Sequence, residues 1–376
     1  MLRATFCRPA LAILVLALGV SGCASTASVF VWQPAEAHIS GIRRLAVLDF
    51  RGPENRGQIA RSALVAKFAE NGFYELVDQG QLGPIQGPNG LPDVNRAIYA
   101  ARAQGIDALL VGDVVSYDVA DDVQRDQNFE FGGATGKNGK EQVAQMLMGM
   151  RIEKNETINR EVSVALAFQL IDVRTGRILA AKQTAHTDAG TMTNGEGYLP
   201  GRDRGLTEMM DFCSRDIVHM LAPHQVSYEV DLASANWGKA AKEIRAGNKC
   251  AEKADWATAE AHWETALGLD PDNHAAMHNL ALARAARMDY AGADRLLEDA
   301  IALKGTSLYT ESRALVSRQR ERYLTAMAQH DARVRRPMTA PDYAGPSSQP
   351  VPGPAVQRTG HVAVPNGTVP YGNPMR

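Results

Sequence analysis

The sequence predicts an α/β fold, a mixed sheet with flanking helices, followed by an all-α module. Strand and helix patterns alternate over residues 43–232, and a 34-residue self-similarity covers residues 240–331. The chain is 45% hydrophobic and 22% charged, which is typical of a globular protein. Its 40 basic and 42 acidic side chains form no concentrated basic field, so no nucleic-acid partner is expected.

Residues 1–22 predict a secretory signal peptide. An apolar run at residues 10–20 follows two arginines and is too short to span a membrane comfortably. It ends in a motif of small residues and a cysteine: Val20, Ser21, Gly22 and Cys23. The motif resembles the lipobox of bacterial lipoproteins, which implies a cysteine acylated with chains such as palmitate. Ordinary secretory cleavage with an incidental Cys23 is the alternative.

Acylation of Cys23 would anchor the protein to a membrane, because each buried methylene contributes about 0.8 kcal/mol. Ala24 stands where an Asp would resemble an inner-membrane retention signal, which favours the periplasmic face of the outer membrane. Residues 23–42 are expected to form a linker. The membrane, reached through the lipid, is therefore the first predicted partner.

The α/β domain begins with a strand pattern at residues 43–50. A helix pattern at residues 56–71, a strand at residues 73–77, a helix around residues 94–104 and a buried strand at residues 107–117 complete a β-α-β-α-β order.

The second half of the domain begins at residues 161–172, where apolar and polar side chains alternate as in a strand with one buried face. A turn at residues 173–176 leads to a hairpin partner at residues 177–187. An amphipathic helix at residues 206–221 and a last strand at residues 226–232 follow.

These patterns resemble the curli-secretion (CsgG/HfaB-type) bacterial lipoproteins and the related lipoprotein activators of cell-wall synthases. The resemblance lies in RRLAVLDF at residues 43–50, IDALLVGDVVSY at residues 106–117 and VSVALAFQLIDVRTGRILAA at residues 162–181. It covers residues 43–222 and implies an α/β domain used for envelope assembly or export, including curli assembly, rather than for catalysis.

The family's pore formers insert two long hairpins per subunit into the membrane. The first candidate here, residues 118–160, is rich in charge, and only residues 143–152 approach the required alternation; they fit a short helix equally well. The second candidate, residues 188–202, has no alternation. Both departures argue against pore formation.

We expect a non-enzyme without cofactor or metal. The glycines at residues 132–136 do not form a phosphate-binding loop, because Phe131 and Ala134 stand where its first glycine belongs. His274 and His278 lie four residues apart without a third ligand nearby, which favours solvated helix histidines over a metal site.

Two cysteines remain after the signal peptide and the lipobox. They are Cys213 and Cys250, both on apolar helix faces. A disulfide between them and a pair of buried thiols are equally good interpretations in an oxidising compartment.

The self-similarity of residues 240–331 resembles two tetratricopeptide repeats. A shift of 34 residues superposes large side chains on large ones and alanines on alanines. The predicted repeat-packing residues are Gly247, Trp256, Ala259, Trp263, Ala266, Leu280, Tyr290, Ala293, Leu297 and Ala300. A capping helix is expected at residues 308–328.

Such repeats present a concave face to a protein partner or peptide, and Lys253, Glu260 or Arg284 are candidates to line it. A structural spacer and a self-association surface are the alternatives. The proline- and glycine-rich residues 337–376 predict a disordered tail.

The first functional hypothesis is an outer-membrane lipoprotein that acts as a periplasmic scaffold or accessory factor in envelope, adhesin or surface-polymer assembly and secretion. It works through protein-protein contacts and is a candidate homo-oligomer. The alternatives are a ring-forming export channel of the curli-secretion kind and a lipoprotein activator of a cell-wall synthase.

Overall fold

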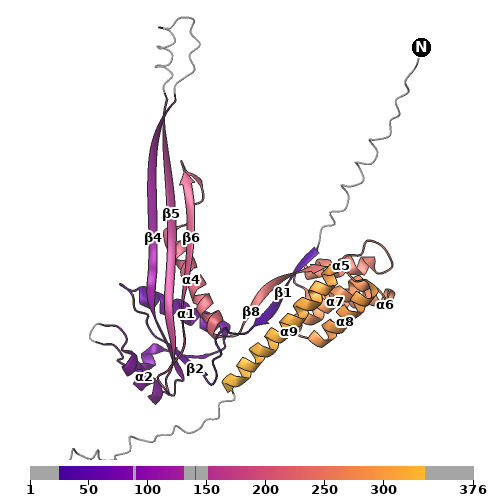
Figure 1. The fold of residues 1–376 in the computed structure, drawn as a ribbon, viewed down its shortest axis with the longest axis horizontal. Coiled ribbons are helices and arrows are strands. Elements are labelled where there is room, and N and C mark those ends of the chain that lie inside the picture. The colour runs from indigo at the N-terminus through magenta and orange to yellow at the C-terminus, as the bar shows by residue number, and fades with distance from the viewer. Residues whose placement is uncertain (1–24, 88–89, 131–139, 141–150, 335–376) are drawn as a thin grey trace, which may run out of the picture. The chain divides into compact units, whose positions relative to one another are not determined.

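The computed structural model describes residues 25–87, 90–130, 140 and 151–334 (Figure 1). The predicted signal peptide, the lipobox with Cys23 and the tail lie outside the described residues. So do the glycines at residues 132–136 and most of the ambiguous segment at residues 143–152. In the part of the chain that is described, no helix is both long and apolar enough to cross a membrane.

A six-stranded mixed sheet forms the α/β domain. Its strands are β2 (Arg44–Val47), β3 (Glu75–Val77), β4 (Ala108–Glu130), β5 (Arg151–Asp172), β6 (Ile178–Thr193) and β7 (Glu196–Gly197). They lie in the order β3-β2-β4-β5-β6-β7. The pairs of β2 with β3 and β4 are parallel, because helices cross between these strands, whereas β4, β5, β6 and β7 are antiparallel neighbours.

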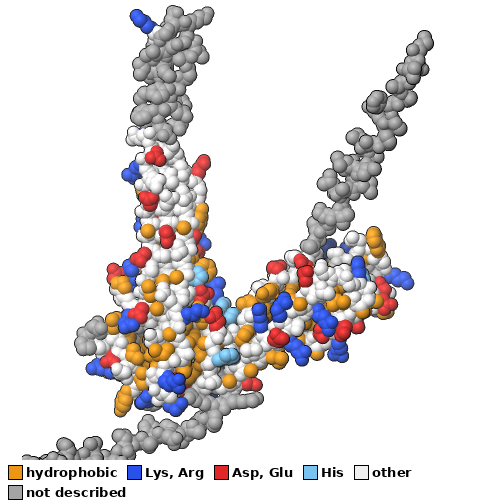
Figure 2. Space-filling model, viewed as in Figure 1, with side chains coloured by type: hydrophobic (Ala, Val, Ile, Leu, Met, Phe, Trp, Pro, Cys, Tyr) orange, Lys and Arg blue, Asp and Glu red, His pale blue; other side chains and the backbone are white. Residues whose placement is uncertain are grey.

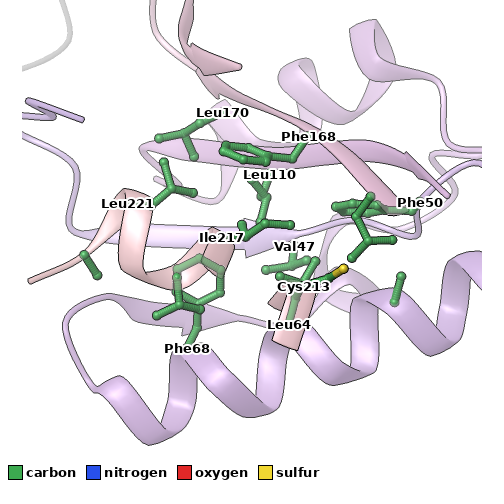
Figure 3. Close-up of a cluster of buried hydrophobic side chains, with 14 of the residues drawn as sticks. Val47, Phe50, Leu64, Phe68, Leu110, Phe168, Leu170, Cys213, Ile217 and Leu221 are labelled. Atoms are coloured by element: carbon green, nitrogen blue, oxygen red, sulfur yellow. The ribbon is translucent and has the colours of Figure 1, made fainter. Parts of the chain in front are cut away.

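Helices cover both faces of the sheet where its strands are apolar. One apolar cluster packs α1 (Arg56–Asn71) and α4 (Arg202–Leu221) against β2, β4 and β5 (Figure 3). A second cluster packs α2 (Val94–Ala103) and the short helix η1 (Gln79–Leu82) on the other face. The alternation predicted for β5 sets this burial, and its inward side chains are at most 2% exposed: Val162, Val164, Leu166, Phe168 and Leu170.

The strands β4 and β5 form a hairpin much longer than the sequence predicts. They pair continuously from Ala108 with Asp172 to Glu130 with Arg151, apart from a register shift between Val114 and Ser116. The predicted strands end at residue 117 and begin again at residue 161, so both bounds are too short: β4 continues to Glu130, and β5 begins at Arg151. The sequence does not predict these parts of the strands, because their side chains are mostly polar and show no apolar alternation. Their backbone hydrogen bonds form without such a pattern.

Residues 23–42 are not only a linker. β1 (Ser25–Gln33) pairs in antiparallel register with β8 (His224–Leu232), and the two form a separate two-stranded sheet, the ribbon. The last predicted strand thus leaves the sheet of the α/β domain. One face of the ribbon packs on the helices that follow.

Within the described residues up to 334, five helices follow the ribbon. They are α5 (Ala241–Ala251), α6 (Trp256–Leu269), α7 (His274–Ala286), α8 (Tyr290–Leu303) and the long α9 (Ser307–Val334). The side chains of Asp255 and Asp289, 34 residues apart, cap the N-termini of α6 and α8. The helix pairs α5/α6 and α7/α8 repeat with this period, and α9 packs on α8.

Candidate functional site

Two helix-borne amides hold the chain where the ribbon ends. Asn248 of α5 and Asn279 of α7 are both buried and both contact the backbone of Ala233. The Asn279 side chain accepts a hydrogen bond from the Ala233 N–H at 2.8 Å and donates to its carbonyl at 2.9 Å. Asn248 donates to the same carbonyl at 3.1 Å. We call Asn248 and Asn279 the amide clamp.

Asn279 of the amide clamp uses all of its hydrogen-bonding capacity. Asn279 donates to the Asn248 side-chain oxygen at 2.8 Å, and Trp263 Nε1 donates to the same oxygen at 3.2 Å. His278 Nδ1 contacts Asn279 Oδ1 at 2.9 Å. Asn279 therefore uses two donors and two acceptor positions, which is the capacity of an amide.

His278 supports the clamp in its neutral form. Because Asn279 Oδ1 only accepts, Nδ1 of His278 carries the proton, and its Nε2 accepts from the Ser312 hydroxyl at 2.9 Å. Burial is the main cause that lowers the pKa of His278 to about 4. The prediction of a solvated helix histidine is wrong at this position, since His278 has no exposed surface. His274 instead contacts the Tyr309 hydroxyl at 2.6 Å.

Further contacts join the ribbon to the helices. Trp256 Nε1 donates to the Ser28 carbonyl at 3.0 Å, and the Ser25 hydroxyl donates to Glu252 at 2.7 Å. Ala27, Val29 and Val31 of β1 are at most 4% exposed. The surface around the amide clamp is thus occupied by the protein's own ribbon.

The structure gathers the predicted repeat-packing residues between the helices. A Cβ on Gly247 would lie 2.4 Å from Trp263 Nε1, so the close approach of α5 and α6 requires glycine there. Trp256 is partly buried, and the others of the set are at most 5% exposed: Ala259, Trp263, Ala266, Leu280, Tyr290, Ala293, Leu297 and Ala300.

The charged residues predicted to line a concave binding face of the repeats are only partly exposed to solvent. Glu260 is 6% exposed and is paired with Arg284 at 2.9 Å and with Arg287 at 2.8 Å. Lys253 is exposed at the turn after α5. The pair of Glu260 and Arg284 therefore joins α6 to α7 rather than facing a ligand.

The cysteines are free thiols, and the disulfide alternative is not what the structure contains. Cys213 of α4 belongs to the core of the α/β domain, and Cys250 of α5 packs against the cluster of the helical repeats. Cys213 donates to the Val164 carbonyl at 3.3 Å. Burial raises the pKa of this thiol to about 11, so it is not an activated nucleophile.

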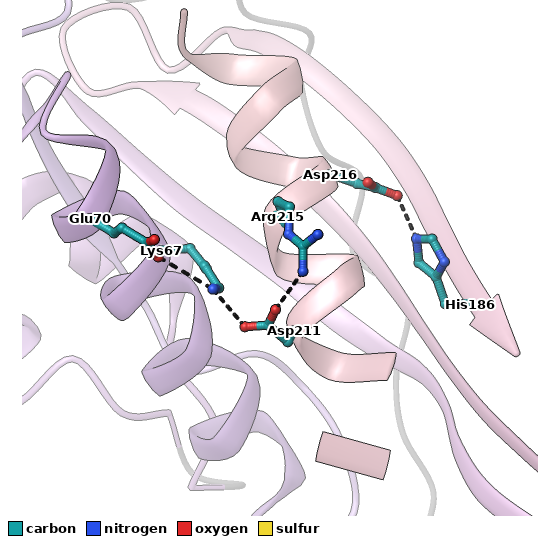
Figure 4. A network of polar contacts seen from close by, with 6 residues as sticks. All are labelled: Lys67, Glu70, His186, Asp211, Arg215 and Asp216. Carbon is teal, nitrogen blue, oxygen red and sulfur yellow. Dashed lines mark hydrogen bonds and ion pairs between the residues drawn. The ribbon is translucent and has the colours of Figure 1, made fainter. Parts of the chain in front are cut away.

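A polar network near Cys213 joins α4 to α1 and β6 (Figure 4). Lys67 of α1 contacts Asp211 of α4 at 2.8 Å, and His186 of β6 contacts Asp216 of α4 at 2.7 Å. The hydrogen bond with Asp211 is the main cause that raises the pKa of Lys67. These contacts connect elements of the fold.

The second candidate region is the outer part of the hairpin. From Ser116 onward β4 pairs only with β5, and β6 pairs only with β5 from Ile178 to Thr191, within the residues that the structure describes. Both flanks of this three-stranded ladder thus carry backbone groups that no described strand pairs. Such edges are templates for strand addition.

The outer arms of the hairpin, residues 121–130 of β4 and 151–160 of β5, carry charged or polar side chains on both faces. Asp121 of β4 binds Arg160 of β5 through two hydrogen bonds of 2.6 and 3.1 Å and also binds Arg202. The hydrogen bond from Arg160 is the main cause that lowers the pKa of Asp121. Arg125 and Glu156 pair on the same face at 2.9 Å. In Figure 2 most of the described hairpin surface is backbone or side chains that are neither charged nor hydrophobic, with scattered charges.

Sequence analysis did not identify the amide clamp or the open edges. A signal for the clamp was present at Asn279, which is followed by the apolar residues 280–283 in a predicted helix, where a buried amide needs partners. A signal for β1 was present as well, in the alternating Ala27, Val29 and Val31.

No family model matches the chain, and no curated protein matches its sequence. Solved structures give partial matches. The PelC dodecamer from Paraburkholderia phytofirmans is 18% identical, with 52% of this chain and 96% of that chain covered and a TM-score of 0.25. The LpoB C-terminal domain from Salmonella enterica is 20% identical, with 39% and 84% covered and a TM-score of 0.23.

A third structure matches a shorter part of the chain. The second TPR of Spaghetti (RPAP3), bound to an HSP90 peptide, is 20% identical, with 26% of this chain and 90% of that chain covered and a TM-score of 0.22. At such TM-scores these likenesses support no argument about function. The contacts and open edges of this chain are therefore the basis for its proposed function.

Proposed function

We propose that this protein is a lipid-anchored scaffold of the bacterial envelope that binds other proteins by adding their strands to the edges of its β4–β5–β6 ladder. The observation that carries the proposal is the pair of open strand edges on an elongated polar hairpin. Strand addition supplies affinity through main-chain hydrogen bonds and needs no enzymatic group.

The anchoring half of the proposal rests on the lipobox and the ribbon. Cys23 lies two residues before Ser25, the first residue of β1. The ribbon and the amide clamp fix β1 to the helical repeats, so a lipid on Cys23 would tether the repeats directly. On this proposal the repeats hold the anchor strand, and the partner-binding role moves to the hairpin.

A second candidate is the ring-forming export channel, and the length of the hairpin favours it. A lipid-facing strand needs apolar side chains at alternate positions. In the described arms, one face carries Asp121, Arg125 and Glu156, and the other carries Asp122 and Asp126. This distribution of charge favours a hairpin that stays in water, and hence the scaffold.

A shortened hairpin tests the scaffold. Ala120 and Glu161 are partners in the ladder, so an Asn-Gly turn between them removes the outer arms without changing the core register. In the full-length chain, a photo-crosslinker at the exposed Gln124 of β4 or at the exposed Thr187 of β6 should give a discrete envelope adduct. The adduct from Thr187 should persist in the shortened variant, because Thr187 keeps its ladder partner Ser163. The absence of an adduct from both positions would contradict binding at the ladder edges.

Two further measurements separate the candidates. Replacing Cys23 with Ser should release the protein from membranes, and continued retention would argue against the lipid anchor. Electron microscopy of the detergent-extracted protein should show no closed ring with a central opening. Such a ring would favour the channel.

A further inference from the structure

The solvent side of α5 is basic. Lys242, Arg245 and Lys249 are exposed and spaced i, i+3 and i+7, so they lie along one side of the helix. We call these three residues the basic face. Two exposed lysines flank α5 on either side: Lys239 and Lys253. Each acidic side chain of residues 239–255 has a partner: Glu243 contacts His262, Glu252 accepts from Ser25, and Asp255 accepts from the Thr258 N–H.

The basic face adjoins the start of β1. Glu252 follows α5 directly and contacts Ser25, while Leu232 pairs with Ser25 in the ribbon. Only Ala24 separates Ser25 from Cys23, and the two Cα–Cα steps between them span at most about 7 Å. The proposed acyl chains are therefore attached beside this end of α5, which lies next to β1 (Figure 1).

An aromatic side chain projects from the loop between the ribbon and α5. Trp237 is 87% exposed, the largest exposed fraction among the large hydrophobic side chains of the described residues. Arg245 of the basic face donates to the Asn236 carbonyl at 3.4 Å and so joins this loop to α5. Tryptophan has an apolar ring and a polar N–H, a combination suited to the boundary between headgroups and acyl chains.

We propose that the basic face and Trp237 bind the anionic phospholipid surface in which Cys23 is anchored. The proposal rests on the lipid anchor of the proposed function. Anchoring holds this surface within reach of the headgroups, where lysine and arginine attract phosphate and Trp237 enters the interface. The contact orients the helical repeats on the membrane instead of leaving them free to rotate about the lipid.

Vesicle binding of the unlipidated protein tests the proposal. The mature chain with Cys23→Ser should sediment with phosphatidylglycerol/phosphatidylethanolamine vesicles and not with phosphatidylcholine vesicles, and added salt should weaken binding. Charge reversal at Lys242, Arg245 and Lys249 to Glu should weaken partitioning by about tenfold or more. Replacing Trp237 with Ser should abolish the blue shift of fluorescence on binding.

The matched control reverses three exposed basic residues elsewhere in the helical repeats: Lys304, Arg318 and Arg320. This variant should bind as the parent does. Equal binding to phosphatidylcholine, or an equal loss in the control, would overturn the proposal. Because the assay uses no lipid on Cys23, its failure is separate from a failure of anchoring, which membrane release of Cys23→Ser in cells measures.

Discussion

The ribbon and the outer arms of the β4–β5 hairpin are both antiparallel pairs, but different interactions hold them. The ribbon buries Val29, Val31 and Val230 against the helical repeats, and the amide clamp binds the backbone at its end. From Asp122 to Gln127, all residues of β4 are exposed. The arms depend on the backbone ladder and on cross-strand pairs such as Arg125 with Glu156.

The difference shows that one chain uses one antiparallel pair as a packed structural element and another as an exposed surface. A two-stranded ribbon alone is marginally stable in water, and packing on helices makes it a fixed element. The hairpin gains its order at its base, where β5 enters the apolar core, and extends polar strands with open edges beyond it. Perturbations should therefore be large at the ribbon and small at the arms.

The largest effect is expected from Asn279→Ala. The change leaves the buried N–H of Ala233 and the Nδ1–H of His278 without a partner and removes one of the two donors to Asn248 Oδ1. It should destabilise the ribbon and repeats by about 3 to 4 kcal/mol. All four tryptophans lie in the ribbon, in the loop after it or in the repeats, so tryptophan fluorescence during urea unfolding reports this region. Asn236→Ala, at an exposed asparagine, is the control. A loss below about 1 kcal/mol would mean that the clamp contributes little.

Acidification should act on the same region through His278. Its pKa is about 4 in the folded protein against an ordinary value of 6.5, so the unfolded chain takes up the proton first. Its contribution is complete above about pH 6.5 and is lost as the pH falls toward 4, by up to about 3 kcal/mol. His278→Gln should flatten the dependence of the urea midpoint on pH. An unchanged pH dependence would assign the effect to another group, such as His274.

A matched pair of glycines tests helix packing in the repeats. Gly247→Ala places a Cβ against Trp263, next to Asn248, and should cost about 2 to 3 kcal/mol by overpacking. Gly268→Ala on α6 meets no atom within 4 Å and should stabilise by about 0.5 to 1 kcal/mol through helix propensity. Equal effects of the two changes in urea unfolding would contradict the close helix contact.

The contrast between buried elements and the exposed outer arms also explains which parts of the fold the sequence could predict. Period two from Val162 to Leu170 and period 34 between Trp256 and Tyr290 predicted the core of both regions, because burial imposes those periods. The outer arms bury neither face, so no period marks them.

The clamp joins residues far apart in the chain. Ala233 lies 46 residues before Asn279, and only the tertiary fold brings their hydrogen-bonding groups together. A single sequence identifies Asn279 as polar among apolar neighbours but does not identify its partner. The open edges of β4 and β6 could not be predicted for the same reason. A strand is an edge only when no other strand pairs with that side of it, and the tertiary fold decides this.

The smallest effect is expected at the outer arms. Arg125 and Glu156 pair at 2.9 Å with side chains 77% and 47% exposed, so water and salt screen their attraction. A double-mutant cycle with Arg125→Ala and Glu156→Ala should give a coupling of about 0.5 kcal/mol or less. Hydrogen exchange of peptides spanning residues 121–127 and 154–160 measures it, because local opening of the ladder sets their exchange rate. A coupling several times larger, present with the partner and absent without it, would mean that strand addition dehydrates the pair and makes the arms as fixed as the ribbon.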